Sequence, residues 1–198
     1  MITTKKIYLE EEPKKQLAMH PQKFALWLFL VSVCMLFAAF TSAFIVKKGE
    51  SNWVEFPLPN ILWVTTGIIL LSSITMQLAY FAAKKDELEK LKITLFITFI
   101  LGVAFLVGQY MAWEELYKEG IYFGGSHSHP SGSYLYVFTG LHAVHLISGI
   151  IFLFVMLIYS FKYKIHSKKM VSIEMCATYW HFLDALWIYL VVFLLLNH

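Results

Sequence analysis

Two histidines stand three residues apart inside an otherwise apolar stretch, as His142 and His145 of TGLHAVHLISG. A second apolar stretch, near the C-terminus, carries Glu174, His181 and Asp184. Imidazole and carboxylate groups can ligate haem iron, carry protons, or hydrogen-bond to one another. The surrounding solvent decides between these roles, because an unpaired ionisable group is costly in hydrocarbon.

The composition indicates that this solvent is lipid. Hydrophobic residues make up 59% of the 198 residues and charged residues only 15%. Five apolar runs are each long enough to cross a bilayer as a helix, and they cover residues 24–46, 61–83, 93–113, 134–161 and 173–196. The sequence therefore predicts an all-α, polytopic membrane protein, with an N-terminal arm at 1–23 and a five-helix domain at 24–198.

The basic residues predict the orientation of these helices. All 16 are lysines, and most lie before the first span or in the loops after the second and fourth spans. Only Lys47, Lys48 and Lys118 fall on the other side. The positive-inside rule thus predicts a cytoplasmic N-terminus and an external C-terminus. This asymmetry accounts for the net charge of +3 without a nucleic-acid partner.

Helical spacing predicts how the polar residues are placed. His142 and His145 lie on one face of the fourth span, and Glu174, His181 and Asp184 lie on one side of the fifth. A short loop joins these spans, so they are predicted to be antiparallel neighbours. We therefore expect a polar seam, in which the two histidines face the three ionisable residues and each group finds a hydrogen-bond partner.

Three functions are compatible with the polar seam. In the first, its pairs hold the helices together, and the chain binds no metal or cofactor. In the second, a b-type haem lies between His181 and either His142 or His145, as in the membrane anchor of a quinone-linked oxidoreductase. In the third, the seam conducts protons or ions, as in a small transporter. The structural role is favoured, because the predicted depths of the histidines match poorly for a haem.

Several other residues are predicted to serve packing or to lie on the surface. Gln109 is a buried amide that can bridge helices. His127 and His129 are too few for a metal site, and we expect them to be exposed. Glycines inside the spans let helices approach closely. These glycines are Gly102, Gly108, Gly140 and Gly149.

Two motifs of this chain resemble subunit III of the haem-copper terminal oxidases. The family carries T-G-x-H-x-x-H-x-x-x-G, followed one loop later by E-x-x-x-x-Y-W-H-F-x-D-x-x-W. Spacing and order are kept here, and the similarity extends from Phe24 to the C-terminus. The matching residues are Thr139, Gly140, His142, His145 and Gly149, then Glu174, Tyr179, Trp180, His181, Phe182, Asp184 and Trp187.

The resemblance implies a non-redox subunit of a proton-pumping respiratory oxidase that reduces oxygen to water. Such a subunit has no catalytic centre, and the haem and copper belong to its partners. It packs against subunits I and II, stabilises catalytic subunit I, binds phospholipid and supports proton uptake. The five-helix form implies a multi-pass protein of a bacterial inner membrane. The electron donor is cytochrome c or quinol, and the complex can join a larger respiratory assembly.

Two positions depart from the family pattern. A glutamate common after a serine in the first shared helix is replaced, because Ser32 is followed by Val33. A second glutamate, three residues after Gln109, is replaced by Ala112. Any role of those carboxylates as proton antennae or in lipid tuning is therefore not carried over. Glu114 is the carboxylate that could substitute for the second.

Overall fold

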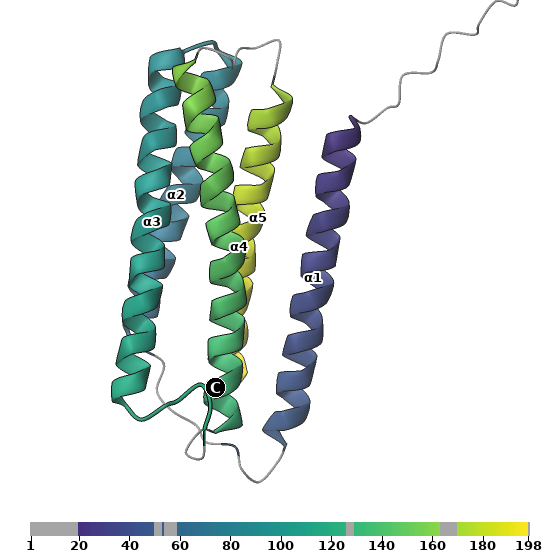
Figure 1. Cartoon of the computed structure of the whole chain (residues 1–198), viewed down its shortest axis with the longest axis vertical. Coiled ribbons are helices and arrows are strands. Elements are labelled where there is room, and N and C mark those ends of the chain that lie inside the picture. Colours follow the sequence, from purple (N-terminus) through teal and green to yellow (C-terminus); the bar gives the residue numbers. More distant parts are fainter. Residues whose placement is uncertain (1–19, 50–52, 54–58, 126–128, 163–169, 198) are drawn as a thin grey trace, which may run out of the picture.

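The computed structural model describes residues 20–49, 53, 59–125, 129–162 and 170–197. Within these ranges it has five α-helices and no strand (Figure 1). The helices are α1 (Pro21–Lys48), α2 (Ile61–Lys84), α3 (Leu88–Lys118), α4 (Pro130–Phe161) and α5 (Val171–Asn197). Each is long and apolar enough to cross a membrane, which confirms the predicted all-α, polytopic class.

Most helices extend beyond the apolar runs that predicted them. The difference is largest for α3, which begins at Leu88 and ends at Lys118 rather than covering 93–113. Hydropathy marks only the part that lies in hydrocarbon, whereas backbone hydrogen bonding continues through the polar flanks. Pro21 and Pro130 stand in the first turns of α1 and α4, where the missing N–H has no helical partner to lose.

The connection between α2 and α3 is a tight turn. Only residues 85–87 separate the two helices, and Asp86 adopts a left-handed conformation with φ of 56°. Aspartate tolerates this conformation better than most residues because its short side chain can hydrogen-bond locally. The turn makes α2 and α3 antiparallel neighbours that pack along their length.

Helix α1 stands apart from the other four. Figure 1 shows α2, α3, α4 and α5 gathered in a bundle, with α1 beside it. Among the described helices, α1 contacts α4 and α5. Because the five helices alternate in direction, Pro21 and Asn197 lie at opposite ends of the bundle. We call the end with Lys23, the α2–α3 turn and Lys162 the lysine-rich end.

Both ends of α1 are attached to α5 by lysines. At the lysine-rich end, the Lys23 ammonium forms an ion pair with Glu174. At the other end, Lys48 Nζ donates to the backbone oxygen of Asn197 at 2.6 Å. Phe44 packs between these ends against Phe193, with ring centroids 5.2 Å apart. These contacts hold α1 along the bundle although it touches only part of it.

Two apolar clusters form the core. One joins all five helices, with Leu30 from α1, and contains the fully buried Trp180 and Trp187. The other lies toward the end of the bundle opposite the lysine-rich end. It joins α1 to α4 and α5 and includes Phe37, Phe138 and Leu190. The helices that carry the polar residues pack against these clusters, while other apolar side chains of the same helices remain exposed.

Candidate functional site

His142 is completely buried between α3, α4 and α5. Its Nε2 lies 3.2 Å from the carbonyl oxygen of Leu183, so the imidazole N–H donates across the α4–α5 interface. The ring lies 5.0 Å from the Trp187 ring and 5.8 Å from that of Phe105, measured between centroids. His142 thus joins three helices by one hydrogen bond and two ring contacts.

His145 faces a different neighbour. Its Nδ1 lies 2.7 Å from the carbonyl oxygen of Leu141 in its own helix. The ring packs against Phe29 and Phe37 of α1, at centroid distances of 6.3 and 5.9 Å. His145 therefore belongs to the α1–α4 contact.

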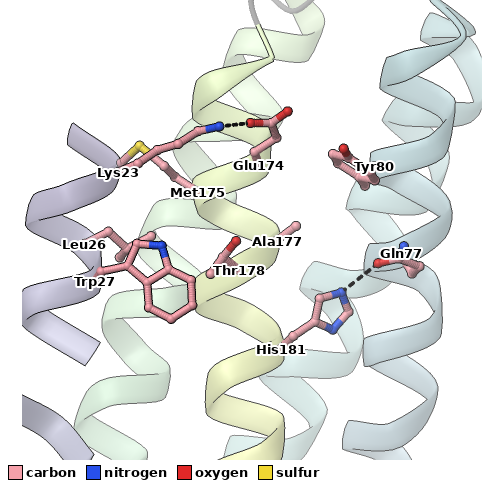
Figure 2. Close-up of a pocket in the computed structure, with 10 residues that line it drawn as sticks. All are labelled: Lys23, Leu26, Trp27, Gln77, Tyr80, Glu174, Met175, Ala177, Thr178 and His181. Carbon is pink, nitrogen blue, oxygen red and sulfur yellow. Dashed lines mark hydrogen bonds and ion pairs between the residues drawn. The ribbon is translucent and has the colours of Figure 1, made fainter. Parts of the chain in front are cut away.

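Glu174 and His181 face the gap between α1 and α2. Glu174 pairs with Lys23 of α1, and both side chains remain about one third exposed. His181 contacts α2 instead, because its Nδ1 lies 2.7 Å from Ser73 Oγ and its Nε2 lies 3.1 Å from Gln77 Oε1. Figure 2 shows His181 reaching toward Gln77 while Lys23 and Glu174 meet nearer the helix ends.

Asp184 lies one turn further along α5 and is almost fully buried. One carboxylate oxygen, Oδ2, lies 3.9 Å from His181 Nδ1. Neither of its oxygens has a hydrogen-bond partner among the described residues. Ser73 Oγ approaches the same His181 Nδ1 more closely, at 2.7 Å.

The structure does not unite these five residues in the polar seam predicted between α4 and α5. Of these five side chains, only that of His142 forms a hydrogen bond between α4 and α5. Its partner is a backbone carbonyl rather than Glu174, His181 or Asp184. The reason is helical geometry: three residues advance 300°, so His142 and His145 point about 60° apart and meet different neighbours. Their role in holding the helices together stays a prediction.

The aromatic residues of the two motifs bond to hydroxyl groups on neighbouring helices. Trp180 Nε1 donates to Ser72 Oγ at 3.0 Å, and Trp187 Nε1 donates to Thr66 Oγ1 at 3.1 Å. The Tyr179 hydroxyl lies 2.6 Å from Ser148 Oγ. Each buried polar edge thereby avoids contact with hydrocarbon while its ring packs in the bundle.

Thr139 performs the same function for an indole on α3. Its Oγ1 accepts a hydrogen bond from Trp113 Nε1 at 2.9 Å. We expect Thr139→Val to lower the free energy of unfolding by about 1–2 kcal/mol, because the indole N–H loses its acceptor while the side-chain volume is kept. Unfolding in mixed detergent micelles would measure this change. Thr94→Val is the matched control, since the Thr94 hydroxyl bonds carbonyls of its own helix, and an equal loss there would contradict the prediction.

Three of the four glycines predicted to serve packing lie in close contact with a neighbouring helix. A Cβ atom on Gly102 would come within 2.7 Å of the Trp180 ring, and one on Gly149 within 2.8 Å of Leu183. A Cβ on Gly108 would lie 2.5 Å from Thr65. The prediction is wrong for Gly140, where a Cβ would meet nothing within 4 Å.

Gln109 is buried, as predicted, but does not bridge helices by a direct bond. Both its amide atoms lack a hydrogen-bond partner among the described residues. The two positions that lack the family glutamates, Val33 and Ala112, are buried in apolar surroundings. Glu114, the carboxylate that could substitute for the second, is half exposed and pairs with Lys118 at 2.7 Å.

No metal centre forms in the described ranges. Nowhere in these ranges do three His, Cys, Asp or Glu side chains gather as they would around a metal ion. His129 is exposed and directly precedes α4, while His127 lies outside the described residues.

Two clefts border α1. The first, which we call the polar cleft, has a volume of about 350 Å³ and lies between α1, α2 and α5 near the lysine-rich end (Figure 2). Its polar lining consists of Lys23, Gln77, Tyr80, Glu174, Thr178 and His181. The second, the apolar cleft, has a volume of about 360 Å³ and lies between Cys34 and Phe37 of α1 and Leu186 and Tyr189 of α5.

The residues missed in the sequence lie on α2. Ser72, Ser73, Thr66 and Gln77 each bond a polar group of α5. Hydroxyl and amide groups within a membrane span are suited to interhelical hydrogen bonds, so the run TTGIILLSSITMQ carried a usable signal. None of these four residues is ionisable, so a search for charged groups within the spans does not find them.

The fold and these contacts define a class: a polytopic helical membrane protein in which intramembrane polar groups mainly join helices. The model of the family cytochrome c oxidase subunit III matches residues 13–197. This chain belongs to the cytochrome c oxidase subunit III family, so it is a subunit of a terminal oxidase.

Curated relatives agree with this assignment. The chain is 30% identical over 178 residues to cytochrome bo(3) ubiquinol oxidase subunit 3 of Buchnera aphidicola subsp. Schizaphis graminum, covering 88% of this chain and 93% of the relative. It is 31% identical to a probable cytochrome c oxidase subunit 3 of Nocardia farcinica, with 81% and 80% covered. It is 29% identical to cytochrome c oxidase subunit 3 of Alkalihalophilus pseudofirmus, with 90% and 92% covered.

Proposed function

We propose that this chain is the non-redox subunit III of a proton-pumping respiratory oxidase, in which it packs against subunits I and II. The partners hold the haem and copper, and this chain stabilises the catalytic subunit. The observation that carries the proposal is the family match across all five helices, together with the two motifs on α4 and α5. The polar groups of those motifs mostly engage hydroxyl, amide or backbone groups of the chain.

The proposal includes a bound phospholipid, and the apolar cleft supports it. Its lining is made of apolar and aromatic side chains from α1 and α5, and its volume suits part of an acyl chain. The cleft lies where α1 packs against α5. We infer that an acyl chain lies in the apolar cleft and extends the contact between α1 and α5.

The orientation and location also belong to the proposal. The lysine-rich end carries Lys23, the lysines of the α2–α3 turn and Lys162, and the positive-inside rule places it in the cytoplasm. A bacterial inner membrane follows from the five-helix form. The polar cleft then opens near the cytoplasmic face, from which an oxidase takes up protons.

Co-purification tests this function. The full chain, affinity-tagged in its native membrane, is expected to bring down two further subunits that mass spectrometry identifies as oxidase subunits I and II, with haem, copper and phospholipid. Recovery of the chain without these subunits would contradict the proposal.

The same preparation separates the two other functions. A Soret band in the isolated chain would indicate the haem-binding membrane anchor. Ion flux through liposomes containing only this chain would indicate a transporter. We expect no Soret band, because both ring nitrogens of His181 are engaged by Ser73 and Gln77, and His142 is buried against the rings of Trp187 and Phe105. We expect no ion flux, because this chain is proposed to act only within the oxidase complex.

A further inference from the structure

A chain of polar groups leads from the polar cleft into the bundle. His181 lies on the wall of the cleft and contacts α2 through Ser73 and Gln77. Asp184 lies deeper, with a side chain 4% exposed, against 34% for His181. Its two oxygens have no hydrogen-bond partner within the described ranges. A buried and unpartnered carboxylate next to a histidine requires a proton or another ligand.

The hydrogen-bond directions around His181 show how a proton could be held. Gln77 Oε1 is an acceptor, so His181 Nε2 carries a hydrogen toward it. Nδ1 is then the acceptor for the Ser73 hydroxyl, at 2.7 Å. Asp184 Oδ2 lies 3.9 Å from this same Nδ1, so the Ser73 oxygen and the Asp184 carboxyl group lie on one side of the imidazole. The Ser73 oxygen keeps a free lone pair, to which a protonated Asp184 can donate.

The charges around this group favour one bound proton. An ionised Asp184 would be a nearly buried carboxylate whose nearest potential cation is His181, at 3.9 Å. Lys23 and Glu174 neutralise each other at the entrance, and Tyr80 of α2 lines the cleft there. On the α4 side, the His142 imidazole bonds the Leu183 carbonyl. A single proton makes Asp184 and His181 neutral together.

We propose that Asp184, Ser73 and His181 form an intramembrane proton-holding site that exchanges with water in the polar cleft. In release, the Asp184 carboxyl proton passes to the Ser73 oxygen and the Ser73 hydroxyl proton passes to His181 Nδ1. The hydrogen bond from His181 Nε2 to Gln77 opens, and the Nε2 proton leaves to water in the polar cleft. In uptake, each transfer runs in reverse, so one proton enters for each one released. The cleft has room for several water molecules, each of which occupies about 30 Å³ in the liquid.

This inference relies on the proposed function only for its place in proton uptake. The site is formed entirely by α2 and α5 of this chain, so it can be tested without partner subunits. Failure to co-purify with an oxidase would contradict the proposed function and leave the site intact. A negative infrared result would rule out the site and leave the proposed assembly unaffected.

Infrared spectroscopy of the full chain in lipid nanodiscs tests the site. We expect a carboxylic acid C=O band that Asp184→Asn removes and that shifts in D₂O. Ser73→Ala is expected to slow this exchange about tenfold, which corresponds to an activation barrier about 1.4 kcal/mol higher. Ser73→Thr is expected to restore it, because the hydroxyl returns.

Ser72→Ala is the matched control for this experiment. Ser72 precedes Ser73 on α2, but its hydroxyl accepts from Trp180 and faces the core. Its exchange rate should equal that of the unmodified chain. The proposal is overturned if Asp184→Asn leaves the band unchanged, if the unmodified chain shows no such band, or if Ser73→Ala and Ser72→Ala exchange at the same rate.

Discussion

Trp180→Ala is expected to lower the free energy of unfolding by about 3 kcal/mol or more, toward the range of about 3–5 kcal/mol for large core aromatics. Trp180 is 1% exposed and joins four helices. Its ring fills the space beside Gly102 of α3 and Gly149 of α4, and its indole N–H donates to Ser72 of α2.

The expected loss of stability in Trp180→Ala comes mainly from lost packing contacts, and less from transfer of the indole between lipid and the protein core. Lipid is as apolar as the core, so burying an indole gains little from the hydrophobic effect within a membrane. Removing the ring instead leaves a cavity whose lining loses its dispersion contacts. Helix association in membranes depends on those contacts. Without the Trp180 ring, α5 would lose its contacts with Gly102 of α3 and Gly149 of α4.

Unfolding of the purified full chain in mixed detergent micelles measures this effect. Trp63→Ala provides the control, because Trp63 is 61% exposed and its removal should change stability little. Trp180→Phe should recover most of the loss, since it keeps a ring but not the bond to Ser72. Equal destabilisation by Trp63→Ala and Trp180→Ala would show that Trp180 does not hold the bundle together.

Gly102→Ala is expected to destabilise the bundle by about 1–3 kcal/mol, the usual range for overpacking a core. The added methyl group would lie 2.7 Å from Cη2 and 3.2 Å from Cζ2 of Trp180. The indole cannot easily move away, because Ser72 holds its N–H and Gly149 lies against its other edge.

The same substitution at Gly140 should have the opposite sign. A Cβ there would meet nothing within 4 Å, so Gly140→Ala adds no clash. Alanine is favoured over glycine inside a helix by up to about 1 kcal/mol, and we expect a neutral or slightly stabilising change. Parallel melting curves of the two variants in one detergent would show the difference.

A double mutant separates the clash from other effects of Gly102→Ala. Combining it with Trp180→Phe should cost less than the sum of the two single changes, because the smaller ring makes room for the methyl group. Strict additivity would mean that Gly102→Ala acts elsewhere, and a similar loss from Gly140→Ala would mean that close approach at Gly102 is not the cause.

The amino-acid order determined the class of this protein and the number of its helices. In lipid, a long apolar run can satisfy all its backbone hydrogen bonds within the segment only as a helix. Each of the five runs forms the predicted helix. The sequence also identified the ionisable positions inside those helices, because such residues are rare in hydrocarbon, but not the hydroxyl and amide groups of α2 that bond to them. Hydropathy could not locate the helix ends, since α3 continues into charged residues at both ends.

The tertiary structure decided which neighbour each polar residue meets. Periodicity gives the direction of a side chain relative to its own helix axis, but not which helix stands on that side. His145 therefore meets α1 and His181 meets α2, and of the two histidine side chains on α4 only that of His142 bonds to α5. Likewise Gly149 lies against Leu183 and Trp180 while Gly140 faces open space, a difference that arises only when the helices pack.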